Sequence, residues 1–486
     1  MNVARRKFLK SVGLGVAGAT FAHALLGVDA VAAAERPMFP TPVEAGKRLA
    51  DGTVHITLEA AEREVLVAGR FARLWTYNGS LPGPTLKLRE GERVELELTN
   101  SLAEPTNFHF HGLHISPTGQ GDNVFRHVSP GETALYAFTV PQGSAGTYWY
   151  HPHVHKAVSK QLFNGLAGAI VVEGAVDDAL SGIPEQLLVL KDFEFQANGQ
   201  IPKHSKMDWM MGREGSLLTV NGAEQPQLGV LEGAIRLRLL NASNARYYRL
   251  QVPEAEIHVT ATDGGSVGAP FLVNELLLAP GERYEVVVQF SQRGQYTLQT
   301  LPYNRAPEEM GTAMEGGDDM VGMSAMGPDS EYAAAPLLQF EVDRASRFVM
   351  PLALTAVPML RAEDATVRRR IVLGEHMEQL KFFIDGKLFD PERTDFLPKL
   401  GTLEHWEFIN ESGMDHPMHL HVHPFQIYAR GGIRELRAAW KDVVNVPANG
   451  SIELLVPFND FAGKTVMHCH IVEHEDFGMM SVIDVA

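Results

Sequence analysis

Residues 77–100 read YNGSLPGPTLKLREGERVELELTN, and the landmarks of this stretch return twice further along the chain. Residues 220–241 and 384–410 each open with an Asn-Gly or Asp-Gly turn, pass a second Gly-containing turn, and close with a strand-like run that ends in Asn. Short runs rich in β-branched residues, separated by Gly, Pro and Asn, are typical of antiparallel β-sandwiches. The threefold repeat therefore predicts an all-β chain of three consecutive Greek-key β-sandwich domains.

A second block follows the first in every copy and supports the same division. Pro-Gly-Glu at 130–132 and 280–282 corresponds to the turn at 447–450, and each leads to a run that begins at Gly. We expect domains over residues 45–175, 176–345 and 365–486. A chain of 486 residues is long enough for three domains at the usual ~150 residues per domain.

Composition excludes several classes of protein. The 42 Lys and Arg against 59 Asp and Glu leave a net charge of −17, which argues against nucleic acid or an anionic membrane surface as a partner. The single Cys cannot form an internal disulfide or a Cys-only zinc or iron–sulfur site. The 20 His, the 18 Met and that Cys therefore need their own explanation.

The N-terminus has the pattern of an export signal. The sequence ARRKFLK at 4–10 precedes a weakly apolar Gly/Ala-rich run and small residues at 30–34. The adjacent arginines resemble the twin-arginine type, so we expect residues 1–34 to be read by the twin-arginine export machinery. An uncleaved membrane anchor is the alternative, but the glycines weaken it because a spanning helix needs about 20 strongly apolar residues. The expected location is periplasmic or extracellular.

Histidines recur at matching positions in the first and third copies. Two lie nine and eleven residues after the closing Asn, and two lie five and seven residues after the later Gly. They are His109, His111, His151 and His153 in the first copy, and His419, His421, His468 and His470 in the third. The second copy has Leu250, Val252, Gln299 and Leu301 at these offsets. Residues i and i+2 of a strand share a face, so the pairs can converge, and eight imidazoles are enough for a small metal cluster.

Cys469 lies between His468 and His470, so its side chain must point to the opposite face of their strand. The third copy also holds His416 six residues after its closing Asn, and His474 and Met479 five and ten residues after the Cys. Two His, one Cys thiolate and a weak axial Met form the ligand set of a blue-copper electron-transfer site. A His₂Cys zinc site is the rival, but zinc has no redox role and leaves the other eight histidines unexplained. A buried inert thiol is the other alternative.

In these motifs the chain resembles the multicopper oxidases. They read HFHG at 109–112, WYHPH at 149–153, HPMHLH at 416–421 and HCHIVEH at 468–474. The similarity covers nearly the whole chain after the signal. It looks closest to the three-domain bacterial laccases and cuprous oxidases, especially the thermophile-type laccase with a Met-rich hairpin. The resemblance implies three cupredoxin-like domains and a copper-dependent oxidoreductase with O₂ as acceptor.

The resemblance also implies four copper ions and their ligands. His416, Cys469, His474 and Met479 would hold the type 1 copper, His109 and His419 the type 2 copper, His111, His151 and His470 one type 3 copper, and His153, His421 and His468 the other. A reducing substrate would lose electrons one at a time at type 1, and Cys469 would pass them through its neighbours to the cluster, where four electrons reduce O₂ to two waters. The reduction consumes four protons, which Glu475 and Asp122 are expected to relay; a structural carboxylate is the alternative for each.

Five methionines gather in an acidic, Gly-rich stretch of the second domain, within a predicted loop over 303–333. They are Met310, Met314, Met320, Met323 and Met326. Thioether sulfur selects Cu(I), so this stretch is expected to collect Cu(I) or admit an organic reductant; a loop with incidental Met is the alternative. Met414 and Asp415, beside His416, are candidate contacts for the electron donor.

The sequence leaves the electron donor open between phenols or aromatic amines and Cu(I). A copper-binding or structural exported protein without turnover is the alternative function, because some exported relatives keep the fold and lack copper. The complete ligand set argues against that alternative. We expect a monomer with no nucleic-acid partner.

Overall fold

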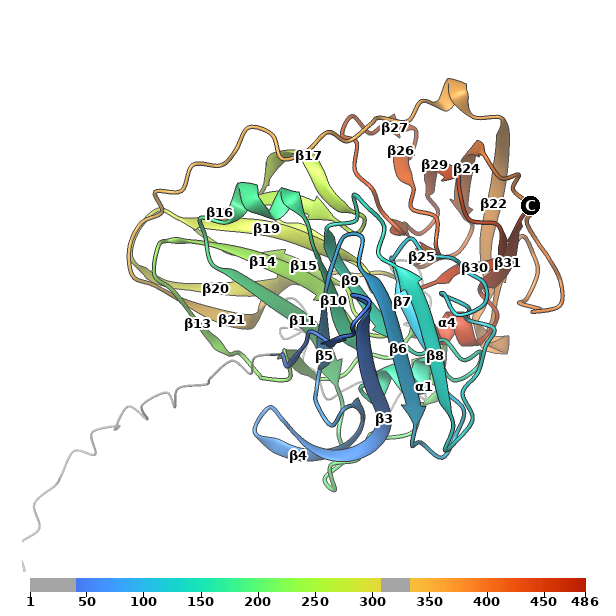
Figure 1. The fold of residues 1–486 in the computed structure, drawn as a ribbon, viewed down its shortest axis with the longest axis horizontal. Coiled ribbons are helices and arrows are strands. Elements are labelled where there is room, and N and C mark those ends of the chain that lie inside the picture. The colour runs from blue at the N-terminus through green and yellow to red at the C-terminus, as the bar shows by residue number, and fades with distance from the viewer. Residues whose placement is uncertain (1–40, 307–332) are drawn as a thin grey trace, which may run out of the picture. The chain divides into compact units, whose positions relative to one another are not determined.

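The computed structural model describes residues 41–306 and 333–486, which lie within one compact unit of the chain. Strands dominate these residues, and the helices among them are short (Figure 1). No helix in the described ranges is long and apolar enough to cross a membrane. The predicted export signal at 1–34 and the five methionines from Met310 to Met326 lie outside the described residues, so both stay predictions.

The first domain consists of two sheets that share one core. Its strands are β1 (Val43–Glu44), β2 (Lys47–Arg48), β3 (Val54–Val67), β4 (Arg70–Tyr77), β5 (Gly83–Arg89), β6 (Arg93–Asn100), β7 (His109–His111), β8 (Thr133–Thr139), β9 (Gly146–His151) and β10 (Gly168–Glu173). One sheet has the order β1-β5-β10-β9-β7 and the other β2-β3-β6-β8, with β4 paired to β3. Leu96, Tyr136 and Ile170 lie in the core between them. The helices α1 (Val158–Phe163) and η1 (Ala175–Leu180) follow β9 and β10.

The second domain repeats this plan. Its elements are β11 (Glu185–Phe193), α2 (Lys206–Met211), β12 (Leu217–Val220), β13 (Gln227–Val230), β14 (Ala234–Asn241), β15 (Tyr248–Gln251), β16 (Ala255–Thr262), β17 (Gly265–Val273), β18 (Leu276–Leu278), β19 (Arg283–Phe290), β20 (Gly294–Leu301) and β21 (Ala335–Val342). The sheets have the orders β12-β11-β14-β19-β16-β17 and β13-β21-β20-β15-β18. Leu237, Leu250 and Phe340 pack between them.

The third domain closes the described chain. Its elements are η3 (Ala362–Asp364), β22 (Val367–His376), η4 (Met377–Gln379), β23 (Lys381–Ile384), β24 (Thr402–Asn410), β25 (His416–Leu420), β26 (Gln426–Arg430), β27 (Ile433–Arg434), β28 (Val443–Val446), β29 (Ser451–Phe458), β30 (Gly463–Cys469), α4 (Val472–Asp476) and β31 (Met480–Val485). The sheets have the orders β23-β22-β24-β29-β26-β27 and β28-β25-β30-β31. Trp406, Met418 and Ile483 lie in their shared core.

Every sandwich contains parallel strand pairs besides the antiparallel pairs that the sequence pattern indicated. β3 runs parallel to β6, β11 to β14 and β22 to β24, at equivalent places in the three domains. In each case the chain leaves the sheet after a tight turn and returns beside the strand from which it left. A Greek-key connection of this kind can place two strands side by side in the same direction, and hydrophobic alternation does not distinguish the two directions.

The closing Asn of each repeat has a physical role. Asn100, Asn241 and Asn410 are buried, and each side chain donates to a main-chain carbonyl of the loop that follows its strand. Asn410 Nδ2 donates to the carbonyl of Met414 (2.8 Å), while its Oδ1 accepts from Ser412 N (3.0 Å). A buried amide satisfied in this way fixes the loop conformation. In the third domain the fixed loop leads directly into the histidines of β25.

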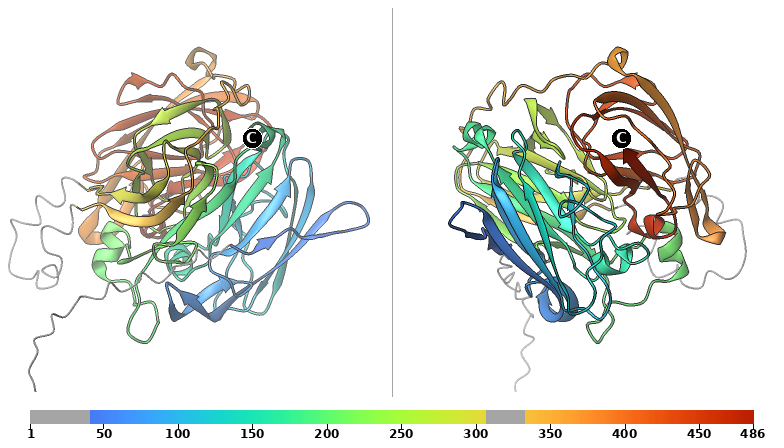
Figure 2. Two further views of the ribbon diagram at one scale, coloured as in Figure 1. Left: turned by 90° about the vertical axis from the view of Figure 1, so that its left-hand side faces the viewer. Right: turned by 45° about the vertical axis from the view of Figure 1, so that its right-hand side comes forward.

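The first and third domains lie against each other, as the blue-to-teal and orange-to-red parts of Figure 2 show. Their contact includes β7 and β25, where the ring centroids of His109 and His419 are 5.5 Å apart. The histidine-bearing strands of the two domains therefore meet.

Candidate metal centre

Strand register brings the histidine pairs together within each domain. In the first domain His109 of β7 is opposite His151 of β9. In the third domain His419 of β25 is opposite His468 of β30. Side chains directly opposite one another in antiparallel strands are close neighbours. The motif spacing therefore becomes a cluster through ordinary sheet pairing.

The eight histidines of the repeats form one buried cluster. Rings from the two domains stack in pairs: His111 on His419 at 3.7 Å between centroids, and His109 on His421 at 3.8 Å. Their possible ligand atoms fall into groups within 4.8 Å of one another: His109, His111 and His419; His111, His151 and His470; and His153, His421 and His468. Each group draws on both domains, so neither domain could form the cluster alone.

In four of these rings the same nitrogen, Nδ1, is hydrogen-bonded to an acceptor outside the cluster. Nδ1 of His109 contacts Asp122 (2.9 Å), and Nδ1 of His151 donates to the carbonyl of Pro152 (2.9 Å). Nδ1 of His419 and of His468 also face main-chain carbonyls, at 2.9 and 3.0 Å. A carbonyl or a carboxylate accepts, so Nδ1 of these rings carries the proton and Nε2 keeps its lone pair. The Nε2 atoms of His109 and His419 accordingly face each other at 3.3 Å.

Burial keeps the cluster histidines neutral. It lowers the pKa of every one of the eight, with further lowering from neighbouring histidines for most of them, and the pKa of His153 and of His468 falls to about 4. Among the described residues, neither ring nitrogen of His470 nor Nδ1 of His421 has a hydrogen-bond partner. Buried polar atoms are almost always paired, and neutral imidazoles with converging lone pairs are good ligands for copper. The donor set therefore fits metal ions.

The face of β30 opposite the cluster carries a second donor set. Cys469 Sγ lies 3.6 Å from His416 Nδ1 and 3.9 Å from His474 Nδ1. Metal–N and metal–S bonds of about 2.0 and 2.3 Å at an angle of about 120° would separate N and S by about 3.7 Å, so these distances suit a trigonal site. Met479 is fully buried in the same core, and its carbonyl accepts from Cys469 N (3.0 Å). Burial raises the pKa of the Cys469 thiol, so the thiolate needs a bound cation.

Both carboxylates predicted to relay protons touch the cluster. Asp122 contacts His109 and lies 3.6 Å from His421 Nδ1, and it accepts from Phe110 N (2.9 Å). Glu475 lies 3.0 Å from His468 Nδ1 and 3.4 Å from His153 Nε2. Burial raises the pKa of each carboxyl to about 7. The structure thus brings both predicted relay residues against the histidines.

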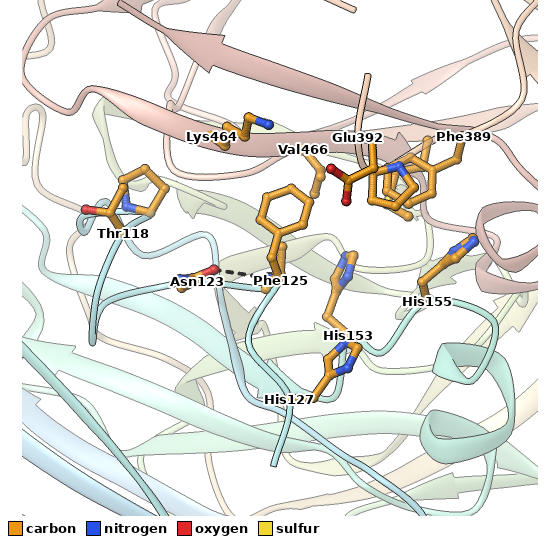
Figure 3. A pocket seen from close by; sticks show the side chains of 14 residues that line it. Thr118, Asn123, Phe125, His127, His153, His155, Phe389, Glu392, Lys464 and Val466 are labelled. Atoms are coloured by element: carbon orange, nitrogen blue, oxygen red, sulfur yellow. Dashed lines mark hydrogen bonds between the residues drawn. The ribbon is translucent and has the colours of Figure 1, made fainter. Parts of the chain in front are cut away.

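A cavity of about 600 Å³ connects this region with the outside (Figure 3). His127, which is exposed, and His153, which is buried, both line it. Phe125 and Phe389 form part of its apolar wall. Small molecules can therefore reach a cluster histidine without crossing the protein core.

The predicted contact of Met414 and Asp415 with an electron donor stays a prediction, and the structure places both residues beneath the surface. Met414 is fully buried, and only 4% of Asp415 is exposed. The Asp415 carboxylate accepts hydrogen bonds from the Tyr303 hydroxyl, Asn445 Nδ2 (2.8 Å) and Ala448 N (2.9 Å). These partners come from distant parts of the chain, so proximity to His416 in sequence did not reveal the burial of the carboxylate.

Sequence reasoning missed three charged residues beside the donor sets. Glu375 Oε2 lies 3.5 Å from His416 Nε2, and Asp442 Oδ1 lies 3.1 Å from His111 Nε2. Arg283, from the domain without cluster histidines, pairs with Asp442. The position of Arg283 after Pro280-Gly281-Glu282, the turn shared with the first copy, was the available signal for its place at a domain junction.

Three cupredoxin-like sandwiches with an eight-histidine cluster and a Cys-containing site define a class of protein, and comparison with known proteins gives the same result. Family models described as multicopper oxidase match residues 59–177, 190–315 and 364–486. Over 430 residues the chain is 32% identical to multicopper oxidase mco of Staphylococcus aureus, covering 86% of this chain and 85% of that protein. The chain belongs to the multicopper oxidase family, which confirms the predicted resemblance and the predicted three-sandwich fold.

Two other relatives show the range of proteins with this fold. A solved multicopper oxidase from Campylobacter jejuni, described as a metallo-oxidase, has a TM-score of 0.81 and 32% identity, and the match covers 93% of this chain and 95% of that chain. The cell division protein FtsP of Yersinia pestis is 30% identical over 474 residues, covering 94% of this chain and 93% of that protein. Family membership implies copper, and the relatives bear names from more than one kind of function.

Proposed function

We propose that this protein takes electrons one at a time from a reducing substrate beside Cys469 and uses four of them to reduce O₂ to two waters among the eight histidines. Bound copper would supply the one-electron steps and the O₂ chemistry. The observation that carries the proposal is the presence of two buried donor sets on opposite faces of the strand β30.

The ligand groups support four copper ions. The groups His111, His151, His470 and His153, His421, His468 suit the two type 3 ions, and His109 with His419 suits type 2. His416, Cys469 and His474, with Met479 beside them in the core, suit type 1. Cys469 is bonded through the main chain to His468 and His470, so electrons have a covalent route between the two sites.

Proton delivery is assigned to Glu475 and Asp122. Glu475 contacts His153 and His468, while Asp122 contacts His109 and His421, so the two carboxyls approach the cluster through different rings. Proton transfer needs a group within hydrogen-bond reach, directly or through one water. The cavity that ends at His153 would let O₂ enter and water leave.

The proposed donors are phenols or aromatic amines together with Cu(I). His474 Nε2 donates to the carbonyl of Met210 (3.1 Å), so α2 lies between this ring and the outside. Met207 of the same helix is 45% exposed, and its thioether is a soft contact for Cu(I). The acidic stretch from Met310 to Met326 is proposed to collect Cu(I). A metal ion as donor is consistent with the description of the Campylobacter jejuni relative as a metallo-oxidase.

We also propose that residues 1–34 direct the chain through the twin-arginine machinery, and that the protein works as a monomer in the periplasm or outside the cell. A fusion of these residues to a reporter should be exported, and replacement of Arg5 and Arg6 by Lys should block export. Export that persists would contradict the twin-arginine assignment.

Copper loading tests the enzymatic proposal. We expect four copper ions per chain, a blue absorbance from the Cys469 site, and O₂ uptake with Cu(I) and with a phenol. A deletion of residues 310–326 should lower the rate with Cu(I) more than the rate with the phenol. Full copper loading without O₂ uptake from either donor would favour a binding or structural role, the alternative that the similarity to a cell division protein raises.

A further inference from the structure

Arg283, at the start of β19 in the second domain, is fully buried and uses all five of its N–H groups. Nε donates to the carbonyl of Thr147 (3.1 Å), Nη1 to that of Gly281 (3.2 Å), and Nη2 to that of Asp263 (2.8 Å). The other two N–H groups donate side by side to the Asp442 carboxylate, each at 2.7 Å. A guanidinium held at every donor cannot turn, so it fixes the plane of the carboxylate opposite it.

Asp442 extends this arrangement to two cluster histidines from different domains. Its Oδ1 lies 3.1 Å from His111 Nε2, and its main-chain carbonyl accepts from His419 Nδ1 (2.9 Å). A carboxylate or carbonyl that accepts from the outer nitrogen of a ligand ring sets which nitrogen faces the metal. Asp442 therefore fixes one ring of the first domain and one ring of the third.

His111 presents the opposite nitrogen from the four rings whose Nδ1 is hydrogen-bonded. Its Nε2 points to Asp442, and its Nδ1 lies 3.4 Å from His151 Nε2, inside the cluster. Only a hydrogen-bond acceptor at Nε2 keeps the proton there and leaves the Nδ1 lone pair for an ion. The Asp442 carboxylate is that acceptor.

Two glycines show how closely the second domain approaches the cluster. A Cβ on Gly112, the residue after His111, would lie 2.2 Å from Arg283 Nη2 and 2.5 Å from Asp442 Oδ2. A Cβ on Gly281 would lie 2.8 Å from the ring of His470. Both positions exclude any side chain, so the absence of Cβ is a condition for the contact between Arg283, Asp442 and the cluster.

We propose that Arg283 is a positioning residue of the metal cluster, acting through Asp442 on His111 and His419. The second domain, which carries no cluster histidine, thereby sets the lone-pair direction of a ligand from the first domain. The inference rests on the proposed function in that the cluster must bind copper. It adds that copper binding requires Arg283 and Asp442, neither of which is a proposed copper ligand.

The test compares two bidentate pairs between an arginine and a buried carboxylate, Arg283 with Asp442 and the half-buried Arg369 with Glu404. In Arg283→Lys an ammonium replaces the guanidinium, keeping the charge but losing the paired geometry. Arg369→Lys is the matched control, because Arg369 pairs bidentately with the buried Glu404 in the third domain (2.6 and 2.8 Å), and neither residue contacts a cluster histidine. Both variants are loaded with copper as full-length protein and dialysed against a graded series of a chelator, and retained copper is counted. The blue absorbance at Cys469 reports on the other site.

We expect Arg283→Lys to lose cluster copper at chelator concentrations about 10- to 100-fold lower than wild type, with the blue absorbance retained, and Arg369→Lys to match wild type. Asp442→Asn provides the same test from the third domain and decides the question if Arg283→Lys does not fold. Copper retention equal to wild type in the folded Arg283 or Asp442 variant would overturn the proposal, leaving the ion pair a purely structural link between domains. A wild-type protein that binds no copper would instead overturn the proposed function itself.

Discussion

The first and third domains carry equivalent histidine pairs, but only the third has a donor set on the reverse face. The position between the pair is Pro152 in the first domain and Cys469 in the third. Six residues after the closing Asn, Thr106 stands in place of His416 and donates to Gln161 Oε1 (2.8 Å). The positions of His474 and Met479 correspond to Ala157 and the fully buried Leu162.

The first and third domains share their strand pairing and differ in the side chains that could bind a metal on the second face. Strand pairing places two histidines on one face in both domains, and a short helix, α1 or α4, follows the second strand in both. Whether that second face can bind a metal depends on four side chains, which in the third domain are His416, Cys469, His474 and Met479. The same sandwich fold accommodates either set of side chains, so duplicated domains can diverge in function.

Removal of Cys469 should have the largest effect on this difference. Cys469→Ser takes away the only soft anionic ligand of the third-domain site, so we expect loss of the blue absorbance and of one copper per chain. Donor-dependent O₂ uptake should fall to the level of copper-free protein, since electrons would have no entry site. The cluster copper should remain. A blue absorbance in the variant would contradict the assignment of this site.

Neutralising Glu475 should have the next largest effect. In Glu475→Gln the amide occupies the same space beside His153 and His468 but cannot carry a proton, so we expect O₂ uptake to fall about 100-fold with the copper count unchanged. Glu473→Gln is the control, because Glu473 is buried in the same helix and bonds Asn244 and His204 instead of cluster rings. Equal losses in the two variants would argue against a proton relay.

The second domain contacts the first through a buried carboxylate, Glu285, instead of through histidines. Burial alone would raise the pKa of Glu285, but the guanidiniums of Arg238 and Arg236 and a hydrogen bond from Thr147 in the first domain outweigh it and lower the pKa to about 2. Stability from this group is therefore present above the ordinary glutamate pKa of about 4.5, and is lost as the pH falls through about 2. The difference of about 2.5 pKa units corresponds to about 3 kcal/mol.

Urea unfolding of the wild type and Glu285→Gln across this pH range checks the expectation. The variant should be less stable by about 3 kcal/mol at neutral pH, and the gap should shrink between about pH 4.5 and about pH 2. A gap that stays constant with pH would show that the carboxylate charge is not the source of the stability.

Pro152→Cys should have the smallest effect, because it adds to the first domain only the cysteine of the third-domain site. The positions that correspond to His416, His474 and Met479 are Thr106, Ala157 and Leu162, none of which offers a nitrogen ligand. We therefore expect no additional blue absorbance and no additional copper. A second chromophore would mean that the Cys alone, without the two histidines and the Met, is enough to create the site.

The chemistry of the site could be predicted from the sequence because it depends on short-range order. The i, i+2 spacing places His468 and His470 on one face of a strand and Cys469 on the other, whatever the rest of the chain does. The threefold repeat likewise showed the all-β class and the three sandwiches. The parallel strand pairs within the sheets could not be predicted, because hydrophobic alternation indicates which face of a strand is buried and not which strand lies beside it.

The repeat spacing already identifies the donor residues, the domains that hold them and the strand face that each pair shares. Domain packing alone reveals that Tyr303 and Asn445 hold Asp415 away from solvent, and that Arg283 reaches the cluster through Asp442. The physical reason is that side-chain direction along a strand follows from backbone geometry, whereas burial and charge pairing depend on residues brought together across hundreds of positions by domain packing.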